Sequence, residues 1–185
     1  MTDTSTRATV CESVDRLMQA EDWGGAIELL GRHLELVTDD AELSWNLGWA
    51  FFRQGRANEA LGPLRRAAEL NPDDASTQWA LGVILSEVGE RADAERHFVR
   101  ALSLRDTGMA RLFLANLYAE QGRIDEAEAV HLEGLRLQPE HGERHEAYAN
   151  FLSDMGREEE SERERGLAET LPSREERKRR AKLRT

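Results

Sequence analysis

The chain has 185 residues, of which 39% are hydrophobic and 33% charged, as is usual for a folded globular protein. Its net charge of −11 argues against a body that binds nucleic acid or acidic membranes over most of its surface. The single cysteine, Cys11, cannot form an internal disulfide. The N-terminal part lacks the apolar run of a signal peptide, and no window approaches the roughly 18 apolar residues of a membrane span. These features predict a soluble, cytoplasmic protein.

Four glycines mark a repeat along the chain. Gly55, Gly89, Gly122 and Gly156 are separated by 34, 33 and 34 residues. A small residue precedes each of them by seven positions, and another follows each by five. Apolar residues between them recur at helical rather than alternating spacing. The pattern predicts stacked helical hairpins, with each glycine in a left-handed turn between two helices.

The first unit is expected at residues 7–40, where AEDWGGAIELLGRHLEL is typical of a turn followed by a second helix. In the next unit, 41–74, the second helix is expected to run to Leu70, because Asn71 and Pro72 end it there. Small residues are expected where the two helices of this unit cross, since bulky side chains would push the helices apart. These small residues are Gly48 and Ala60.

The first helix of the second unit carries two apolar stripes. In WNLGWAFF, Leu47 and Phe51 point to one side of a helix, while Trp45, Trp49 and Phe52 gather on another. One stripe is enough to bury a helix against its neighbours. The second stripe therefore indicates a surface for binding.

These positions resemble the tetratricopeptide repeat family. The family's 34-residue pattern has Trp, Leu, Gly, Tyr, Gly, Ala, Phe, Ala and Pro at positions 4, 7, 8, 11, 15, 20, 24, 27 and 32. The three central units supply most of these residues: Leu47, Gly48, Phe51, Gly55, Ala60, Leu64, Ala67 and Pro72; Leu81, Gly82, Leu85, Gly89, Ala94, Phe98 and Ala101; Leu114, Ala115, Tyr118, Gly122, Ala127, Gly134 and Pro139. Asp106 replaces one proline, Arg165 stands where a core aromatic is expected, and His33 where alanine is usual.

The resemblance implies an all-α fold, an α-solenoid in the form of a right-handed superhelix of about five helical hairpins. It implies one repeat domain over residues 1–172, with repeats at about 7–40, 41–74, 75–107, 108–141 and 142–172. It also implies that the first helix of each hairpin lines a concave groove. The predicted partner-binding residues of that groove are Trp45, Trp49, Phe52, Trp79, Val83, Met109, Leu112, Asn116 and Asn150.

A groove lined by tryptophan favours a non-catalytic module that binds a peptide or helix of a partner protein, as an adaptor, scaffold or chaperone-like protein. The partner is expected to offer apolar anchors with basic flanks, because Glu42, Glu143, Glu146 and Asp154 add negative charge near the groove's ends. Three alternatives stay open. The rings are covered by the protein's own chain, the patch joins copies of the chain, or the chain is an accessory subunit of an enzyme complex.

No catalytic residue, cofactor or metal site is predicted, and the chain is expected not to be an enzyme. The sequence contains no GxxxxGK[ST], GxSxG or HExxH motif. His141 and His145 have a spacing of four residues that suits a metal, but no third ligand accompanies them. Cys11 lacks the basic neighbours that activate a thiol.

The C-terminal segment 173–185, SREERKRRAKLRT, has a charge opposite to that of the rest. Its net charge is +5, so residues 1–172 carry −16. One interpretation is a frayed capping helix that lies on the acidic body. The other is a contact with nucleic acid or the ribosome through Arg177, Lys178, Arg179 and Arg180.

Overall fold

The computed structural model describes residues 4–172, 176, 177, 179, 182 and 183. Its regular elements are eleven α-helices within these residues: α1 (Thr4–Gln19), α2 (Trp23–Arg32), α3 (Leu34–Thr38), α4 (Ala41–Arg53), α5 (Ala57–Leu70), α6 (Ala75–Glu87), α7 (Arg91–Leu104), α8 (Gly108–Glu120), α9 (Ile124–Leu137), α10 (Gly142–Asp154) and α11 (Glu158–Thr170). None of the helices in this described part is long and apolar enough to cross a membrane.

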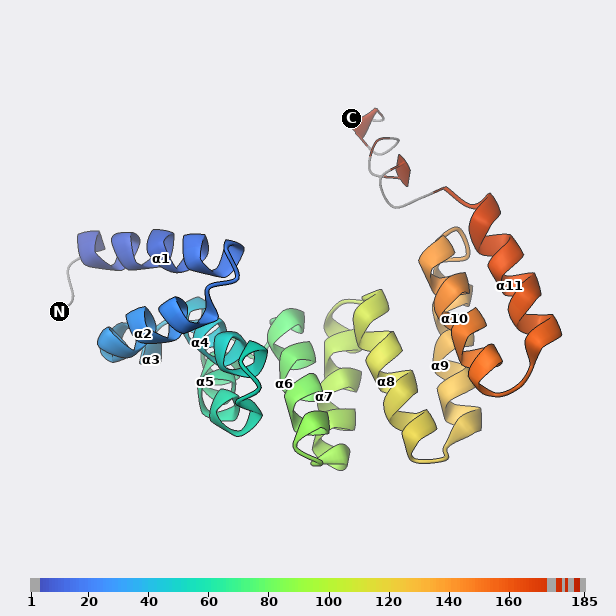
Figure 1. The fold of residues 1–185 in the computed structure, drawn as a ribbon, viewed down its shortest axis with the longest axis horizontal. Helices are drawn as coiled ribbons and strands as arrows, with labels where there is room; N and C mark the ends of the chain where they lie inside the picture. Colours follow the sequence, from blue (N-terminus) through green and yellow to red (C-terminus); the bar gives the residue numbers. More distant parts are fainter. Residues whose placement is uncertain (1–3, 173–175, 178, 180–181, 184–185) are drawn as a thin grey trace. The chain divides into compact units, whose positions relative to one another are not determined.

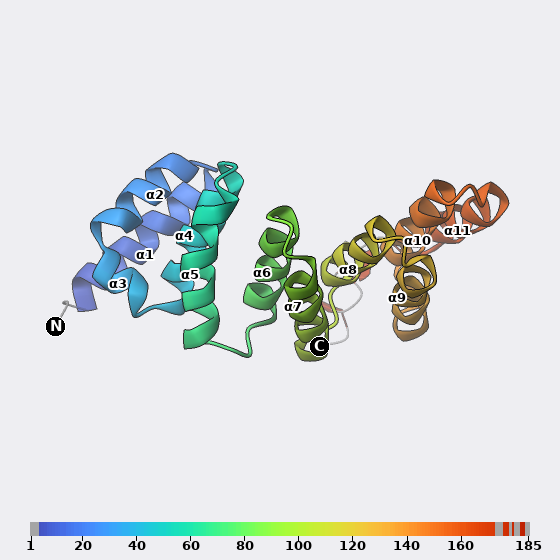
Figure 2. The ribbon, with the colours of Figure 1, turned by 90° about the horizontal axis from the view of Figure 1, so that it is seen from below.

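The helices pair in chain order. α4 packs on α5, α6 on α7, α8 on α9 and α10 on α11, as Figures 1 and 2 show, and α1 packs on α2. The pairs agree with the predicted hairpins, and α5 ends at Leu70 as Asn71 and Pro72 require. The predicted all-α fold, a helical-repeat α-solenoid, is confirmed.

Glycines make the turns within the last four hairpins. Gly55, Gly89, Gly122 and Gly156 have φ between 72° and 84°, the left-handed region that residues with a Cβ adopt at a cost. In the first hairpin the equivalent residue, 34 positions before Gly55, is Glu21, with φ of 55°. The first hairpin therefore closes with strain that the other four avoid.

Replacing Glu21 by glycine is expected to raise the free energy of unfolding by about 1 kcal/mol. Glycine has no Cβ, so the steric cost of the left-handed conformation at this position disappears. The lost Arg53–Glu21 ion pair, 3.6 Å long and exposed, contributes little. Urea unfolding followed by circular dichroism measures the change. The reciprocal substitution Gly55→Glu should lower stability by a similar amount, and equal stability of both variants and wild type would contradict the assignment of strain.

Small residues lie where the helices of a hairpin cross, as predicted. A Cβ added to Gly48 would lie 2.6 Å from Leu64 Cγ and 3.0 Å from the Ala60 carbonyl oxygen. A Cβ added to Gly82 would lie 2.6 Å from the Phe98 ring. Real Cβ atoms essentially never approach another heavy atom to 2.6 Å, so the close approach of α4 to α5 and of α6 to α7 depends on these glycines.

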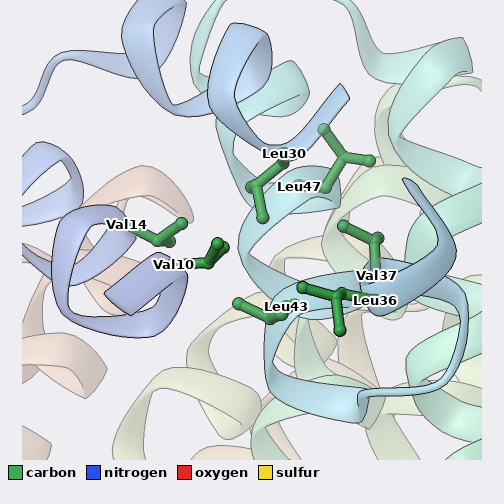
Figure 3. Packing of buried hydrophobic residues seen from close by; sticks show 7 residues of the cluster. All are labelled: Val10, Val14, Leu30, Leu36, Val37, Leu43 and Leu47. Atoms are coloured by element: carbon green, nitrogen blue, oxygen red, sulfur yellow. The ribbon is translucent and has the colours of Figure 1, made fainter. Parts of the chain in front are cut away.

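The chain divides into two compact units, residues 1–105 and 106–185. In the first unit, helices α1, α2, α3 and α4 share a hydrophobic core, called the core of the first unit below. Its buried residues are Val10, Val14, Leu30, Leu36, Val37, Leu43 and Leu47, whose side chains point toward one another in Figure 3. The first hairpin departs from the predicted continuous second helix. At His33, with φ of −119°, the chain leaves the helical region and begins α3, which places Leu36 and Val37 in this core. The single repeat domain over 1–172 stays a prediction.

Candidate protein-binding site

The second stripe of α4 forms an aromatic cluster with α6. Trp45 and Trp49, one helical turn apart, stack with ring centroids 5.5 Å apart and planes 16° apart. The Trp49 ring also lies 5.3 Å from that of Phe52 and 5.4 Å from that of Trp79 on α6. Trp49 is thus the centre of a patch made by Trp45, Trp49, Phe52 and Trp79, called the aromatic patch below.

The two stripes of α4 differ in burial. Leu47 is buried in the core of the first unit, with Phe51 packed against that core. The four rings of the aromatic patch are each only partly buried. The Trp45 Nε1–H is enclosed and has no hydrogen-bond partner within the described residues. Val83, predicted to extend the patch, is 7% exposed and belongs to the buried hydrophobic residues, and its part in binding stays a prediction.

The four remaining predicted residues lie in the second unit. Met109, 52% exposed, and partly buried Leu112 line a groove of about 750 Å³. Asn116 and Asn150 are exposed, and Asn150 lines a smaller pocket of about 480 Å³. The structure brings together the four rings of the aromatic patch, and it does not join them to these four residues within one compact unit. The nine residues as one partner-binding surface remain a prediction.

Of the two histidines with metal-like spacing, His145 has both ring nitrogens engaged in other contacts. His145 Nδ1 lies 2.7 Å from Glu164 Oε2, and its Nε2 lies 3.0 Å from the Pro139 carbonyl oxygen. His141 is the N-cap residue of α10. Within the described residues, no three His, Cys, Asp or Glu side chains are grouped as metal ligands would be.

Cys11 is a partly buried residue of α1, packed against the core of the first unit. Burial raises the pKa of its thiol, and the Asp40 carboxylate raises it further. Since the thiolate is the reactive form, this environment makes the cysteine less nucleophilic.

The described part of the basic segment contacts the second unit. Arg177 Nη2 donates to Glu143 Oε2 at 2.6 Å, and Nη1 donates to the Pro172 carbonyl oxygen at 2.7 Å. The ion pair neutralises Glu143, one of the acidic residues predicted near the groove's ends, and both interpretations of the basic segment stay predictions. Lys178 and Arg180, which belong to the nucleic-acid alternative, lie outside the described residues.

Sequence reasoning missed the polar residues that line the groove of the second unit. Arg111 and Arg144 both pair with Asp106, and His131 is buried beside Tyr148 and Phe151. Burial lowers the pKa of His131 to about 4, with Glu128 raising it and Arg111 lowering it further. The signal in the sequence is a set of departures from the repeat pattern at Asp106, His131 and Gly134.

Known structures share this fold. A crystal structure of MamA matches with a TM-score of 0.70 and 20% sequence identity, over 91% of this chain and 96% of that chain. Another MamA structure has a TM-score of 0.73 and 20% identity over 90% and 91%. MamA from Desulfovibrio magneticus RS-1, from residue 41 to its end, has a TM-score of 0.73 and 13% identity over 89% and 94%. At these identities the likeness concerns the fold alone.

Sequence comparison gives the family. No curated protein matches the chain. The family described as tetratricopeptide repeat matches residues 11–75 and 80–141, which is more than half of the sequence. Repeats of this kind form scaffolds for protein–protein interaction and are typically non-catalytic. The resemblance predicted from the glycine period is confirmed, and the chain belongs to the tetratricopeptide repeat family.

Proposed function

We propose that the chain is a non-catalytic protein-binding module that holds an apolar segment of a partner protein on the aromatic patch. The observation that carries the proposal is the cluster around Trp49, where three further rings lie within 5.5 Å, centroid to centroid. Leu47 already buries α4 against its neighbours, so the patch exceeds what packing of the helix requires. Tryptophan is prominent among residues that dominate binding energy at protein interfaces.

The patch also offers a hydrogen bond. The enclosed Trp45 Nε1–H lacks an acceptor within the described residues, and an indole N–H inside an interface ordinarily finds one. A backbone carbonyl of a bound helix end or extended peptide supplies such an acceptor. The expected partner segment therefore combines an apolar side chain over Trp49 with a carbonyl near Trp45. The basic flanks and the cytoplasmic location remain predictions from the sequence.

The proposal is tested with tagged protein recovered from its native cell. The triple variant Trp45→Ala, Trp49→Ala, Trp79→Ala is expected to lose the partner that co-purifies with wild type, because the apolar surface and the indole donor disappear together. Circular dichroism checks that both proteins are equally helical. Trp23→Ala is the matched control, since that ring is also partly buried, lies on α2 and contacts Arg53 instead of the patch.

Retention of the same partners by the triple variant would contradict the proposal. Light scattering separates the self-association alternative from a foreign partner. If the aromatic patch joins two copies of the chain, wild type has twice the monomer mass and the triple variant does not. A monomeric wild type that still loses its partner on substitution supports the proposed function.

A further inference from the structure

A groove of about 750 Å³ in the second unit contains charge that its own residues do not balance. It is formed along α8, α9 and α10 of the second unit, which Figure 1 labels. Its lining includes the apolar side chains Met109, Leu112 and Ala147. Beside them lie Asp106, Arg111, His131, Gly134 and Arg144.

Two buried guanidinium groups share one carboxylate there. Arg111 Nε donates to Asp106 Oδ1 at 2.7 Å, and Arg144 Nη2 lies 3.3 Å from Asp106 Oδ2. The Arg111 side chain is 12% exposed and that of Arg144 8%. Arg144 Nε also donates to Gln138 Oε1 at 3.0 Å. Glu143 and Arg177, which also line the groove, neutralise each other in an ion pair. The groove therefore carries one net positive charge, although residues 1–172 together carry −16.

Three polar atoms of the lining are enclosed and make no hydrogen bond within the described residues: Arg144 Nη1, His131 Nε2 and Asp106 Oδ2. The Asp106 oxygen still has Arg144 Nη2 at 3.3 Å as its ion-pair partner, so within the described residues the two atoms left without any partner are Arg144 Nη1 and His131 Nε2. A buried charged donor without an acceptor is costly, so such atoms in a native protein call for a bound group or water. They belong to different helices, Arg144 to α10 and His131 to α9, and both side chains line the same groove.

The backbone makes room for these groups. A Cβ on Gly134 would lie 2.7 Å from Arg144 Nη1 and 3.0 Å from Arg111 Cδ, so a larger residue here would require both arginine side chains to shift. The groove also reaches Gly108 and Met109, in the first turn of the 13-residue helix α8. Amide groups at a helix start carry partial positive charge and add to the field of the arginines.

Departures from the repeat pattern meet at this groove. The pattern has proline where Asp106 stands, phenylalanine where His131 stands and alanine where Gly134 stands. The unit from Ala41 keeps the apolar or small type at all three positions, with Pro72, Leu64 and Ala67. Stacking of the repeats does not explain an imidazole, a glycine and a carboxylate that pairs with two arginines at one place.

We propose that this groove binds an oxyanion, the side-chain carboxylate of an acidic residue in a partner segment, through Arg144 Nη1 and His131 Nε2–H. Met109, Leu112 and Ala147 receive the apolar neighbours of that acidic residue. A protein segment is favoured over a free anion because this apolar wall adjoins the charged residues, and an inorganic ion makes no use of it. The site is separate from the aromatic patch and does not depend on it.

The test uses two short peptides and the full chain in ¹H–¹⁵N NMR. Ac-Leu-Glu-Leu-NH₂ is expected to shift the Arg144 Nε–H signal and the Gly134 amide, whereas its neutral isostere Ac-Leu-Gln-Leu-NH₂ binds at least tenfold more weakly. Arg144→Met should also reduce the affinity for the glutamate peptide at least tenfold. Arg136→Met removes the same group from α9 at an exposed position paired with Glu133 and is expected to bind as wild type does.

Stability separates a ligand-binding role from a structural one. When Arg144 is replaced, Asp106 remains paired with Arg111 and is not left as an unpaired buried charge. Arg144→Met is therefore expected to have the same melting temperature as wild type or a higher one, while it no longer binds the glutamate peptide. If Arg144→Met does not fold, His131→Phe serves instead, because phenylalanine keeps the ring packing against Tyr148 and Phe151 and removes the polar atom.

Four results would overturn the proposal: no binding of the glutamate peptide to wild type, equal binding to Arg144→Met, equal binding of the glutamine peptide, or binding of inorganic phosphate alone. The last result would assign the groove to a free anion.

The triple tryptophan variant provides the link to the proposed function. It should bind the glutamate peptide as wild type does, so either proposal can fail without the other.

Discussion

Replacing Phe98 by alanine is expected to lower the free energy of unfolding by about 3–5 kcal/mol. The Phe98 ring, on α7, is fully buried in the first unit, and it lies against Gly82 of α6. Its removal takes apolar area away from the interior and leaves a cavity between two helices that the glycine cannot fill. Urea unfolding followed by circular dichroism measures the loss, and a change below about 1 kcal/mol would mean that the helices close onto the cavity.

Gly82 provides the second arm of the same experiment. Gly82→Ala alone is expected to cost about 1–2 kcal/mol, because overpacking against Phe98 outweighs the gain in helix propensity. The double variant should cost less than the two single changes combined, since the new methyl enters the space that the ring vacates. Gly166→Ala is the control. Gly166 lies within α11 with no neighbour that a Cβ would meet and precedes a leucine, so alanine there should stabilise by about 1 kcal/mol.

The fold could be predicted because the backbone conformations that the glycines favour agree with the packing of the helices. Gly55 and its three equivalents had to make left-handed turns, and Gly48 and Gly82 had to let helices approach, whatever the rest of the chain did. The exceptions are in the first hairpin. There Glu21 occupies the left-handed position, and the second helix breaks at His33, so neither departure follows from a pattern based on the other units.

The candidate site could be predicted only in part. The aromatic patch follows from spacing, since Trp45 and Trp49 are one helical turn apart and Trp79 is 34 residues after Trp45. Periodicity could not show that Val83 is buried, because burial depends on what covers a face. The groove of the second unit was missed because Arg144 and His131 meet only through tertiary packing. In the sequence, each is one of several polar residues in its helix, and nothing marks it out from the others.

His131 is expected to make stability depend on pH between about 6.5 and 4. Burial lowers its pKa from 6.5 to about 4 in the folded chain, while the unfolded chain keeps the ordinary value. In that window the unfolded state binds the proton and the folded state does not. Stability is therefore complete above pH 6.5 and falls as the pH drops toward 4, by about 3 kcal/mol in all. Denaturant unfolding at a series of pH values measures the slope.

His131→Phe isolates this contribution, because every other ionisable residue is present in both proteins. The variant should lose the extra slope between pH 6.5 and 4, and a slope identical to that of wild type would contradict the assignment. At pH 7 it should be more stable by about 1 kcal/mol or more, since an enclosed nitrogen without a hydrogen-bond partner is replaced by carbon. A stabilising phenylalanine at the position where the repeat pattern has phenylalanine would mean that the histidine costs stability. That is the expected sign for a residue kept for binding rather than for packing.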